Sequence, residues 1–441
     1  MKAILYASLA LSLAVTAMPA AAQFDNTLNL FSPYTLYGVG NLNTGGTAAA
    51  GTMAGVGAAL RSATSFNAVN PASYSAAAAQ TFIFSFGMQG QNDYLKSSNY
   101  RSSHNAFNIN DVSVQFRIAE KLGFGLSLTP YSTVGYKVSF TDRSSVMAES
   151  GTVMYSYSGS GGFSRLKAGL GWSPFKNFSV GVDMLYYLGT VKRITESSVS
   201  DIVSSSTEYR TIRITDRNQI NTVNFEVGVQ YEYPLRGGRA FTVGAVYEPK
   251  RKADLNHTRN IISDGTSVTD VIFDLSDKTG FDMPHRVVAG IGYRTDKLSL
   301  GFDYDYQRWK GAIESEKIGG GGIFEATDMH NIRAGFEYTP NRYDIRQVMK
   351  RWTYRGGVRY GNTYYTMNGK KITECAVSVG FGAPLQRNGF TAVNFGAEAG
   401  RGYTEPGALP RHIRTDISRL QHIRRTGVVR TTQVQIGLKS P

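Results

Sequence analysis

Residues 224–233 read NFEVGVQYEY, a run in which every second side chain is apolar. The positions between them are polar or glycine. The apolar set is Phe225, Val227, Val229, Tyr231 and Tyr233. A period of two places successive side chains on opposite faces of a β-strand. This segment is therefore predicted to be a strand with one apolar and one polar face.

The same alternation recurs through most of the chain after Thr81. It is clearest in residues 111–118, 298–307, 331–338 and 433–438. The chain contains 48 Gly, 26 Tyr and 23 Phe, a composition that suits many long strands with aromatic residues at membrane interfaces. The sequence thus indicates an all-β fold.

The connections between these runs alternate between short and long. Short ones are expected near 119–121 and 295–296, and long ones near 259–281 and 312–326. Outer-membrane barrels have short periplasmic turns, long outer loops and an even number of strands. We expect 14 strands between residues 80 and 439. One periplasmic connection, 340–351, is about a dozen residues long and breaks the pattern.

Soluble antiparallel sheets also alternate, but here the polar face carries many charged and small residues, as a wet or plugged lumen would. An open sheet edge cannot be satisfied in lipid, so a membrane-spanning sheet has to close on itself. The predicted fold is therefore a 14-stranded antiparallel transmembrane β-barrel over residues 80–441. The mean hydropathy of −0.23, with no run near 18 apolar residues after the first two dozen, excludes a helical membrane protein.

Residues 1–22 have the features of a secretory signal peptide. Lys2 precedes an apolar stretch at 4–15, and Ala20-Ala21-Ala22 ends it. We expect cleavage after Ala22 and export to the bacterial outer membrane. The alternative is a buried N-terminal helix.

Residues 23–79 are rich in Gly, Ala, Ser and Asn and lack sustained alternation. A barrel of this size has an interior wider than its own side chains can fill. The segment is therefore predicted to fold inside the barrel as a hatch, or alternatively to be a disordered periplasmic tail. Asn70-Pro71 favours a turn before the first strand, and Gly55 and Gly57 permit close approach to the wall.

Short motifs in this segment carry a resemblance to a known family. Ser32-Pro33-Tyr34 and Tyr37-Gly38 precede MAGVGA at 53–58. NPASYS at 70–75, which begins with Asn70-Pro71-Ala72, comes next and leads to the strand residues 81–86. This arrangement resembles the FadL-type (OMPP1/FadL/TodX) outer-membrane transport proteins, especially their divergent homologues in Bacteroidota. The resemblance implies a 14-stranded barrel with an N-terminal hatch, and a kinked third strand that opens a lateral window for apolar cargo.

Pro130 lies inside an otherwise regular strand, 122–142, which is third by our count. Proline removes a ladder donor, so a bulge or an edge is expected there. With Gly135, it marks either the lateral opening that the resemblance implies or a bulge above the membrane. If it marks the opening that the resemblance implies, Pro130→Ala combined with Gly135→Val should reduce uptake of apolar cargo without unfolding the barrel.

Charged residues on the polar face are expected to pair with basic partners or with the hatch backbone, because an unpaired buried charge is costly. This set is Asp183, Glu226, Glu232, Asp303, Asp305, Arg333, Glu337, Glu374 and Glu398. They could also line a polar path.

The net charge of +14 is assigned either to solvated loops or to attraction toward lipid phosphates. The basic segment 403–428 is either an ordinary loop or a contact for lipopolysaccharide. Nucleic acid is not an expected partner of an exported protein.

No catalytic arrangement emerges from the sequence. The six His are scattered and no Gly-x-Ser-x-Gly elbow is present, so the chain is not expected to be an enzyme. The single Cys375 excludes an internal disulfide and a Cys-based zinc site. No cofactor, no metal and no substrate pocket can be assigned.

We therefore expect a monomeric channel for passive uptake of hydrophobic molecules such as long-chain fatty acids, embedded among outer-membrane lipids and lipopolysaccharide. Cargo would leave past the hatch, by a lateral opening or through the lumen. The alternative is a FadL-like barrel that acts as a scaffold or shuttle in protein secretion or surface attachment. A general porin is a third reading.

Overall fold

The computed structural model describes residues 30–43, 46–96, 101–142, 152–200, 211–264, 269–314, 316–318, 322–385, 391–404 and 424–439. The predicted signal peptide lies outside these residues, as does most of the basic segment 403–428. Within the described part, no helix is long and apolar enough to cross a membrane.

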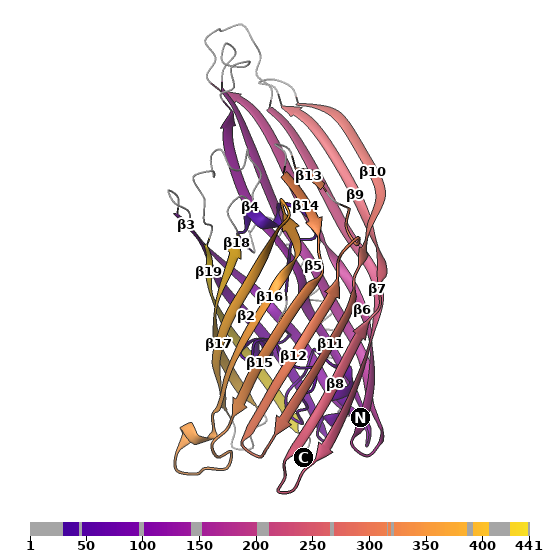
Figure 1. Ribbon diagram of the computed structural model, residues 1–441, viewed down its shortest axis with the longest axis vertical. Helices are drawn as coiled ribbons and strands as arrows, with labels where there is room; N and C mark the ends of the chain where they lie inside the picture. The colour runs from indigo at the N-terminus through magenta and orange to yellow at the C-terminus, as the bar shows by residue number, and fades with distance from the viewer. Residues whose placement is uncertain are drawn as a thin grey trace.

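The described residues form a single antiparallel sheet, shown in Figure 1, to which nineteen strands contribute. Fourteen of these strands pair in a ring. They are β2 (Thr81–Lys96), β3 (Arg101–Ala119), β4 (Leu122–Asp142), β5 (Thr152–Phe175), β6 (Phe178–Ser200), β7 (Thr211–Pro234), β8 (Ala240–Glu248), β11 (His285–Arg294), β12 (Leu298–Arg308), β15 (Met329–Tyr338), β16 (Thr353–Met367), β17 (Lys370–Pro384), β18 (Ala392–Thr404) and β19 (Arg424–Lys439). The ring closes where β19 pairs with β2 from Arg424↔Lys96 to Lys439↔Thr81. The predicted all-β class is confirmed.

Alternation sets the two faces of the wall. In β7, Phe225 is 52% exposed and Tyr231 is 50% exposed, whereas Glu226 and Gln230 between them are buried. Apolar side chains therefore point outward, and polar ones point into the ring. This is the arrangement that a bilayer requires of a barrel.

Five further strands of the described residues are not members of the ring. They are β1 (Asn41–Leu42), β9 (Arg251–Asp264), β10 (Thr269–Met283), β13 (Glu316–Ile318) and β14 (Gly322–Ala326). The β9–β10 hairpin pairs with the upper part of β7, Thr211–Ile220, while β8 pairs directly with β11. Together with the long strands β4 to β7 it forms a raised wall on one side of the barrel (Figure 1).

Two stretches that the sequence suggested as outer loops therefore contain strands. Residues 259–281 form most of the β9–β10 hairpin, and residues 312–326 contain the β13–β14 hairpin. The sequence RKADLNHTRNIISD of β9 shows no regular alternation, because both of its faces are partly exposed above the membrane.

Residues 30–79 lie inside the ring and contain β1 and three short helical turns. These turns are η1 (Pro33–Leu36), α2 (Ala48–Gly51) and η2 (Pro71–Ala76). The segment contacts strands on all sides: η2 lies against β3 to β7, and α2 lies against β18, β19 and β2. A fourth turn, η3 (Val348–Arg351), lies in the long connection between β15 and β16.

Candidate functional site

The wall is interrupted between β3 and β4. Pairing of these strands runs from Ala119↔Leu122 to Val112↔Leu128, and no pair beyond it joins their described residues. Above that point β3 continues to pair only with β2, and β4 continues to pair with β5. The two strands therefore separate, and the upper part of β4 has an edge that β3 does not cover.

Pro130 stands immediately above the last β3–β4 pair. The register of the β4–β5 ladder shifts between Pro130 and Ser132, which is the bulge that a proline in a strand predicts.

The free edge of β4 is occupied by residues 30–43, which we name the strap. The amide of Ser32 donates to the carbonyl of Gly135 at 2.7 Å, and the amide of Asn43 donates to the carbonyl of Tyr131 at 2.8 Å. Between them, β1 pairs with Ser132 and Thr133. A Cβ at Gly135 would collide with the backbone carbonyl of Leu30, so only glycine allows this approach. The strap thus satisfies backbone groups that the missing β3 partner leaves open.

Tyr34 and Val39 of the strap pack into an apolar cluster in the lumen. Tyr364 on β16 accepts a hydrogen bond from the amide of Val39 at 3.0 Å and donates to the carbonyl of Gly40 at 2.8 Å. The cluster includes Tyr34, Val39, Val134, Tyr136, Phe163, Tyr187, Trp309, Phe324 and Tyr364. Apolar surface inside the barrel therefore adjoins the β3–β4 interruption.

Residues 46–79, which we name the plug, are tied to the wall by buried polar groups. One carboxylate oxygen of Asp303 accepts from the amides of Gly57 and Ala58 at 2.7 and 2.9 Å. Arg333 donates to the carbonyl of Gly55 at 3.2 Å. The expectation that these charged residues contact the N-terminal backbone is confirmed.

Asn70 fixes the end of the plug. Its Oδ1 accepts from the amide of Ala72 at 3.0 Å, and its Nδ2 donates to the carbonyls of Ala58 at 2.7 Å and Val229 at 3.2 Å. Pro71 then begins η2, whose residue Ala72 is fully buried. Gly55 has a positive φ of 78°, and the Cβ position of Gly57 faces Val69 of the plug rather than the wall. The wall supplies its own glycines for close approach: a Cβ at Gly244 would collide with the carbonyl of Ala58.

Ion pairs link the strands beneath and beside the plug. Lys167 lies 2.6 Å from Glu226, and Asp305 is bound by both Arg333 at 2.6 Å and Arg286 at 3.0 Å. Glu337 and Glu398 pair with Arg355 and Arg359, respectively. Buried charges of this kind persist only when paired. Lys167 and Arg286 were not singled out from the sequence, although Lys167 alternates with Leu166 and Ala168 as a lumen residue should.

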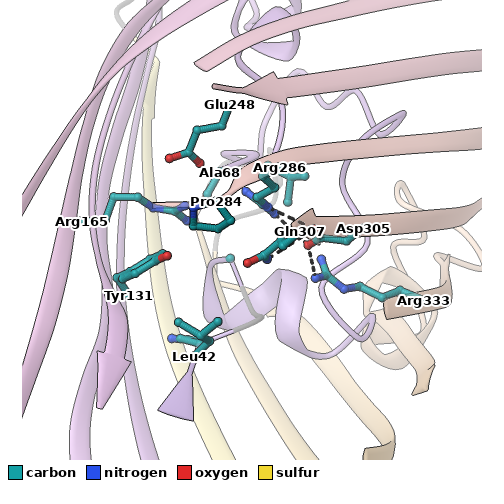
Figure 2. A pocket seen from close by; sticks show the side chains of 13 residues that line it. Leu42, Ala68, Tyr131, Arg165, Glu248, Pro284, Arg286, Asp305, Gln307 and Arg333 are labelled. Carbon is teal, nitrogen blue, oxygen red and sulfur yellow. Dashed lines mark hydrogen bonds and ion pairs between the residues drawn. The ribbon is translucent and has the colours of Figure 1, made fainter. Parts of the chain in front are cut away.

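Figure 2 shows a small chamber between the strap, the plug and the wall. Arg165, Glu248, Arg286, Asp305 and Arg333 line it together with Tyr131, and the Arg165 guanidinium lies 5.8 Å from the ring centre of Tyr131. Leu42, Ala68, Val69 and Pro284 complete the lining on its apolar side. The described residues contain no group of three or more His, Cys, Asp or Glu that could hold a metal ion.

The fold is similar to those of solved outer-membrane channels. A FadL homologue from Pseudomonas aeruginosa matches with a TM-score of 0.59 at 14% identity, over 91% of this chain and 99% of that chain. The CymD monoaromatic hydrocarbon channel matches with a TM-score of 0.57 at 15% identity, over 91% and 99%. The toluene transporter TodX from P. putida matches with a TM-score of 0.54 at 12% identity, over 90% and 99%. At such identities the likeness concerns the fold.

Among curated protein sequences, none matches this chain. The family model named BamG does match, over residues 3–409. This range includes the strap, the plug and every ring strand except the last. The chain therefore belongs to the BamG family, and its barrel has the fold of the FadL-type outer-membrane proteins.

Proposed function

We propose that this chain is an outer-membrane channel for the passive uptake of hydrophobic molecules, which leave sideways between β3 and β4. The observation that carries the proposal is the end of β3–β4 pairing at Val112↔Leu128. Lipid cannot satisfy an open strand edge, so such an interruption is tolerated only where another group covers it. The strap is that group, and its removal would open a path from the lumen to the acyl chains.

The plug makes the sideways route preferable to a straight one. Its bonds to Asp303 and Arg333 are buried and charge-assisted, a class worth about 1.5–3 kcal/mol each. The bonds of the strap to β4 involve neutral backbone groups, which contribute about 0.5–1.5 kcal/mol each. The pairing of the strap with β4 should therefore open at a lower cost than the plug contacts, and a charge-assisted bond of the strap, from Arg193 to the carbonyl of Gly38 at 2.6 Å, would have to break with it.

The apolar cluster beside β4 supports a hydrophobic cargo such as a long-chain fatty acid or an aromatic hydrocarbon. The hydrocarbon channel and toluene transporter with the same fold point in this direction. Such a channel needs no cofactor and no catalytic residue. We place the barrel as a monomer in the outer membrane after cleavage of residues 1–22, with lipopolysaccharide around its outer half.

A reversible lock tests the route. Asn41 and Thr133 are direct partners in the β1–β4 pair, and facing residues of antiparallel strands lie within disulfide range. Asn41→Cys with Thr133→Cys, in a Cys375→Ala background, should tie the strap to β4 when oxidised. Uptake of a radiolabelled long-chain fatty acid and of toluene by cells that express the barrel should fall to background and return on reduction.

A matched lock is available elsewhere in the wall. Val377→Cys with Ala399→Cys joins facing residues of β17 and β18, away from the strap. This control should leave uptake unchanged. Full uptake through the oxidised strap lock would exclude exit between β3 and β4.

A second candidate is a scaffold or shuttle for protein secretion or surface attachment. Two observations favour it: five charged side chains line the chamber of Figure 2, and one side of the barrel is extended by a raised wall. A scaffold should not transport either probe in its unlocked form. The same uptake measurement therefore separates the two candidates.

A further inference from the structure

The connection between β15 and β16 differs from the other turns at its end of the barrel. It spans residues 339–352, whereas β3 and β4 are joined by Glu120 and Lys121 alone. The long turn is internally ordered. The amide of Asn341 donates to the carbonyl of Lys350 at 2.8 Å, and the Asp344 carboxylate accepts from the amides of Arg346 and Gln347 at 2.9 and 2.7 Å. These hydrogen bonds define the backbone conformation of the turn.

This turn is packed on the outward face of the wall. The ring of Trp352 stacks on Phe381 of β17 at 5.0 Å and 10°, and Phe381 in turn contacts Phe395 of β18. Phe381 shares its face with Val379, which is 59% exposed. The hydroxyl of Tyr354 donates to the carbonyl of Met349 at 3.1 Å. In Figure 1 the turn is the orange segment at the lower left, which projects beyond the outline of the barrel.

The projecting turn exposes large apolar side chains. Tyr343 is 84% exposed, Ile345 is 77% exposed and Met349 is 62% exposed, with Val348 beside them. Four large apolar side chains exposed within one short turn indicate an interaction surface. It continues the outward apolar belt of β17 and β18, which faces lipid.

Basic residues outnumber acidic ones in the turn. Arg342, Arg346 and Lys350 are exposed, and none of them forms a salt bridge within the described part of the chain. Asp344 is the one acidic residue of the turn. Donation from the amides of Gln347 and Arg346 lowers the pKa of its carboxyl, so its charge is engaged by the backbone of the turn. Three exposed cations, together with the partly buried Arg351, therefore lie in the same turn as four exposed apolar side chains.

We propose that residues 339–352 are an interfacial anchor that binds anionic phospholipids of the periplasmic leaflet. An apolar group with adjacent Lys and Arg is the combination that seats a segment at the boundary between headgroups and acyl chains. The turn lies at the end of the lipid-facing belt and folds toward it. A lipid surface therefore supplies both the apolar phase and the phosphates within reach of one turn.

Spin labels can measure the depth of the turn in the intact barrel. Cys375→Ala removes the single native cysteine, and Ile345→Cys then places one label on the turn. The barrel is reconstituted in vesicles of phosphatidylcholine with phosphatidylglycerol, and label relaxation is compared for oxygen and a water-soluble nickel chelate. The label at 345 should favour oxygen. A matched label from Glu120→Cys, on the short exposed turn at the same end, should favour nickel.

Charge reversal tests the headgroup. Arg342→Glu, Arg346→Glu and Lys350→Glu together should move the label at 345 toward water in the anionic vesicles, reversing its preference for oxygen over nickel. Heat-modifiable mobility of the barrel checks that this variant is folded. If the label at 345 is as accessible to nickel as the label at 120, the turn is not seated in lipid and the anchor is overturned. That outcome would leave a soluble periplasmic protein as the partner of the exposed apolar side chains. A depth that is unaffected by charge reversal overturns the assignment to anionic lipid.

Discussion

Asp303 shows how single wall residues hold the inner segment. Its carboxylate accepts from two successive plug amides, those of Gly57 and Ala58, in a buried site. A carboxylate in this position accepts hydrogen bonds from two backbone amides, which in a regular sheet would donate to the carbonyls of a neighbouring strand. The plug can therefore be irregular and still have its buried backbone groups satisfied.

We expect Asp303→Ala to loosen the plug without opening the ring. Two amides would lose a charged acceptor, and the local free energy of opening should fall by about 2–4 kcal/mol. Amide hydrogen exchange of the peptide over residues 54–60 measures this loss. Glu120→Ala, on an exposed turn, is the control and should leave exchange there unchanged. Equal exchange in both variants would show that Asp303 does not anchor the plug.

The sequence predicts that Asp303 points into the lumen, but it does not predict which residues Asp303 binds there. Strict alternation with Phe302 and Tyr304 places it in the lumen. Its bond to Gly57 joins residues 246 positions apart, and nothing in the local pattern indicates which part of an irregular segment comes into contact. Gly57 illustrates the same limit, because its Cβ position faces Val69 within the plug and only its amide reaches the wall.

Among the elements, β4 combines a predicted feature with an unpredicted one. Proline inside an alternating run is enough to predict the bulge at Pro130. The end of β3 pairing and its replacement by the strap depend on contacts between residues 30–43 and 131–135, which have no signature in either stretch. The β9–β10 hairpin could not be recognised from the sequence for a related reason. A strand above the membrane does not face lipid, so its sequence need not alternate between apolar and polar residues.

Gly135→Val should dislodge the strap from β4. The new side chain would meet the carbonyl of Leu30, so the bond between Ser32 and Gly135 could not form. This changes the expectation for the double variant with Pro130→Ala, because the added side chain displaces the strap instead of filling the opening. Hydrogen exchange of residues 31–37 should rise, whereas Lys137→Val, at an exposed position of the same strand, should have no effect. Unchanged exchange in Gly135→Val would contradict the close approach of Leu30.

At the scale of the whole molecule, the ring and the raised wall are separable. The ring continues from β8 to β11 through their own pairing, from Arg286↔Glu248 to Arg294↔Ala240. The hairpin adds height by pairing with β7 above that point. The number of strands in the membrane is thus set by the ring alone. The ring has the expected 14 strands, and the additional strands do not change that number.

Replacing residues 257–277 by Asn-Gly should remove the upper hairpin and leave the barrel folded. The replacement keeps Phe281 and Met283, which pack in the lumen cluster. We expect the midpoint of the heat-induced mobility shift to stay within about 1 °C of the parent, corresponding to roughly 1 kcal/mol or less for a chain of this size. An unfolded variant would mean that the wall supports the ring. Loss of a partner protein with retained uptake would assign the wall to attachment.

The seam of the ring has a consequence for biogenesis. β2 is the first ring strand to be synthesised, and its second neighbour, β19, is the last. The cylinder cannot be sealed until translation and export of the entire sequence are complete. The strap and plug leave the ribosome before any ring strand, so they must already be in place, or be threaded in, when the seam forms. Variants in residues 30–79 should therefore affect the rate of maturation as well as the finished channel.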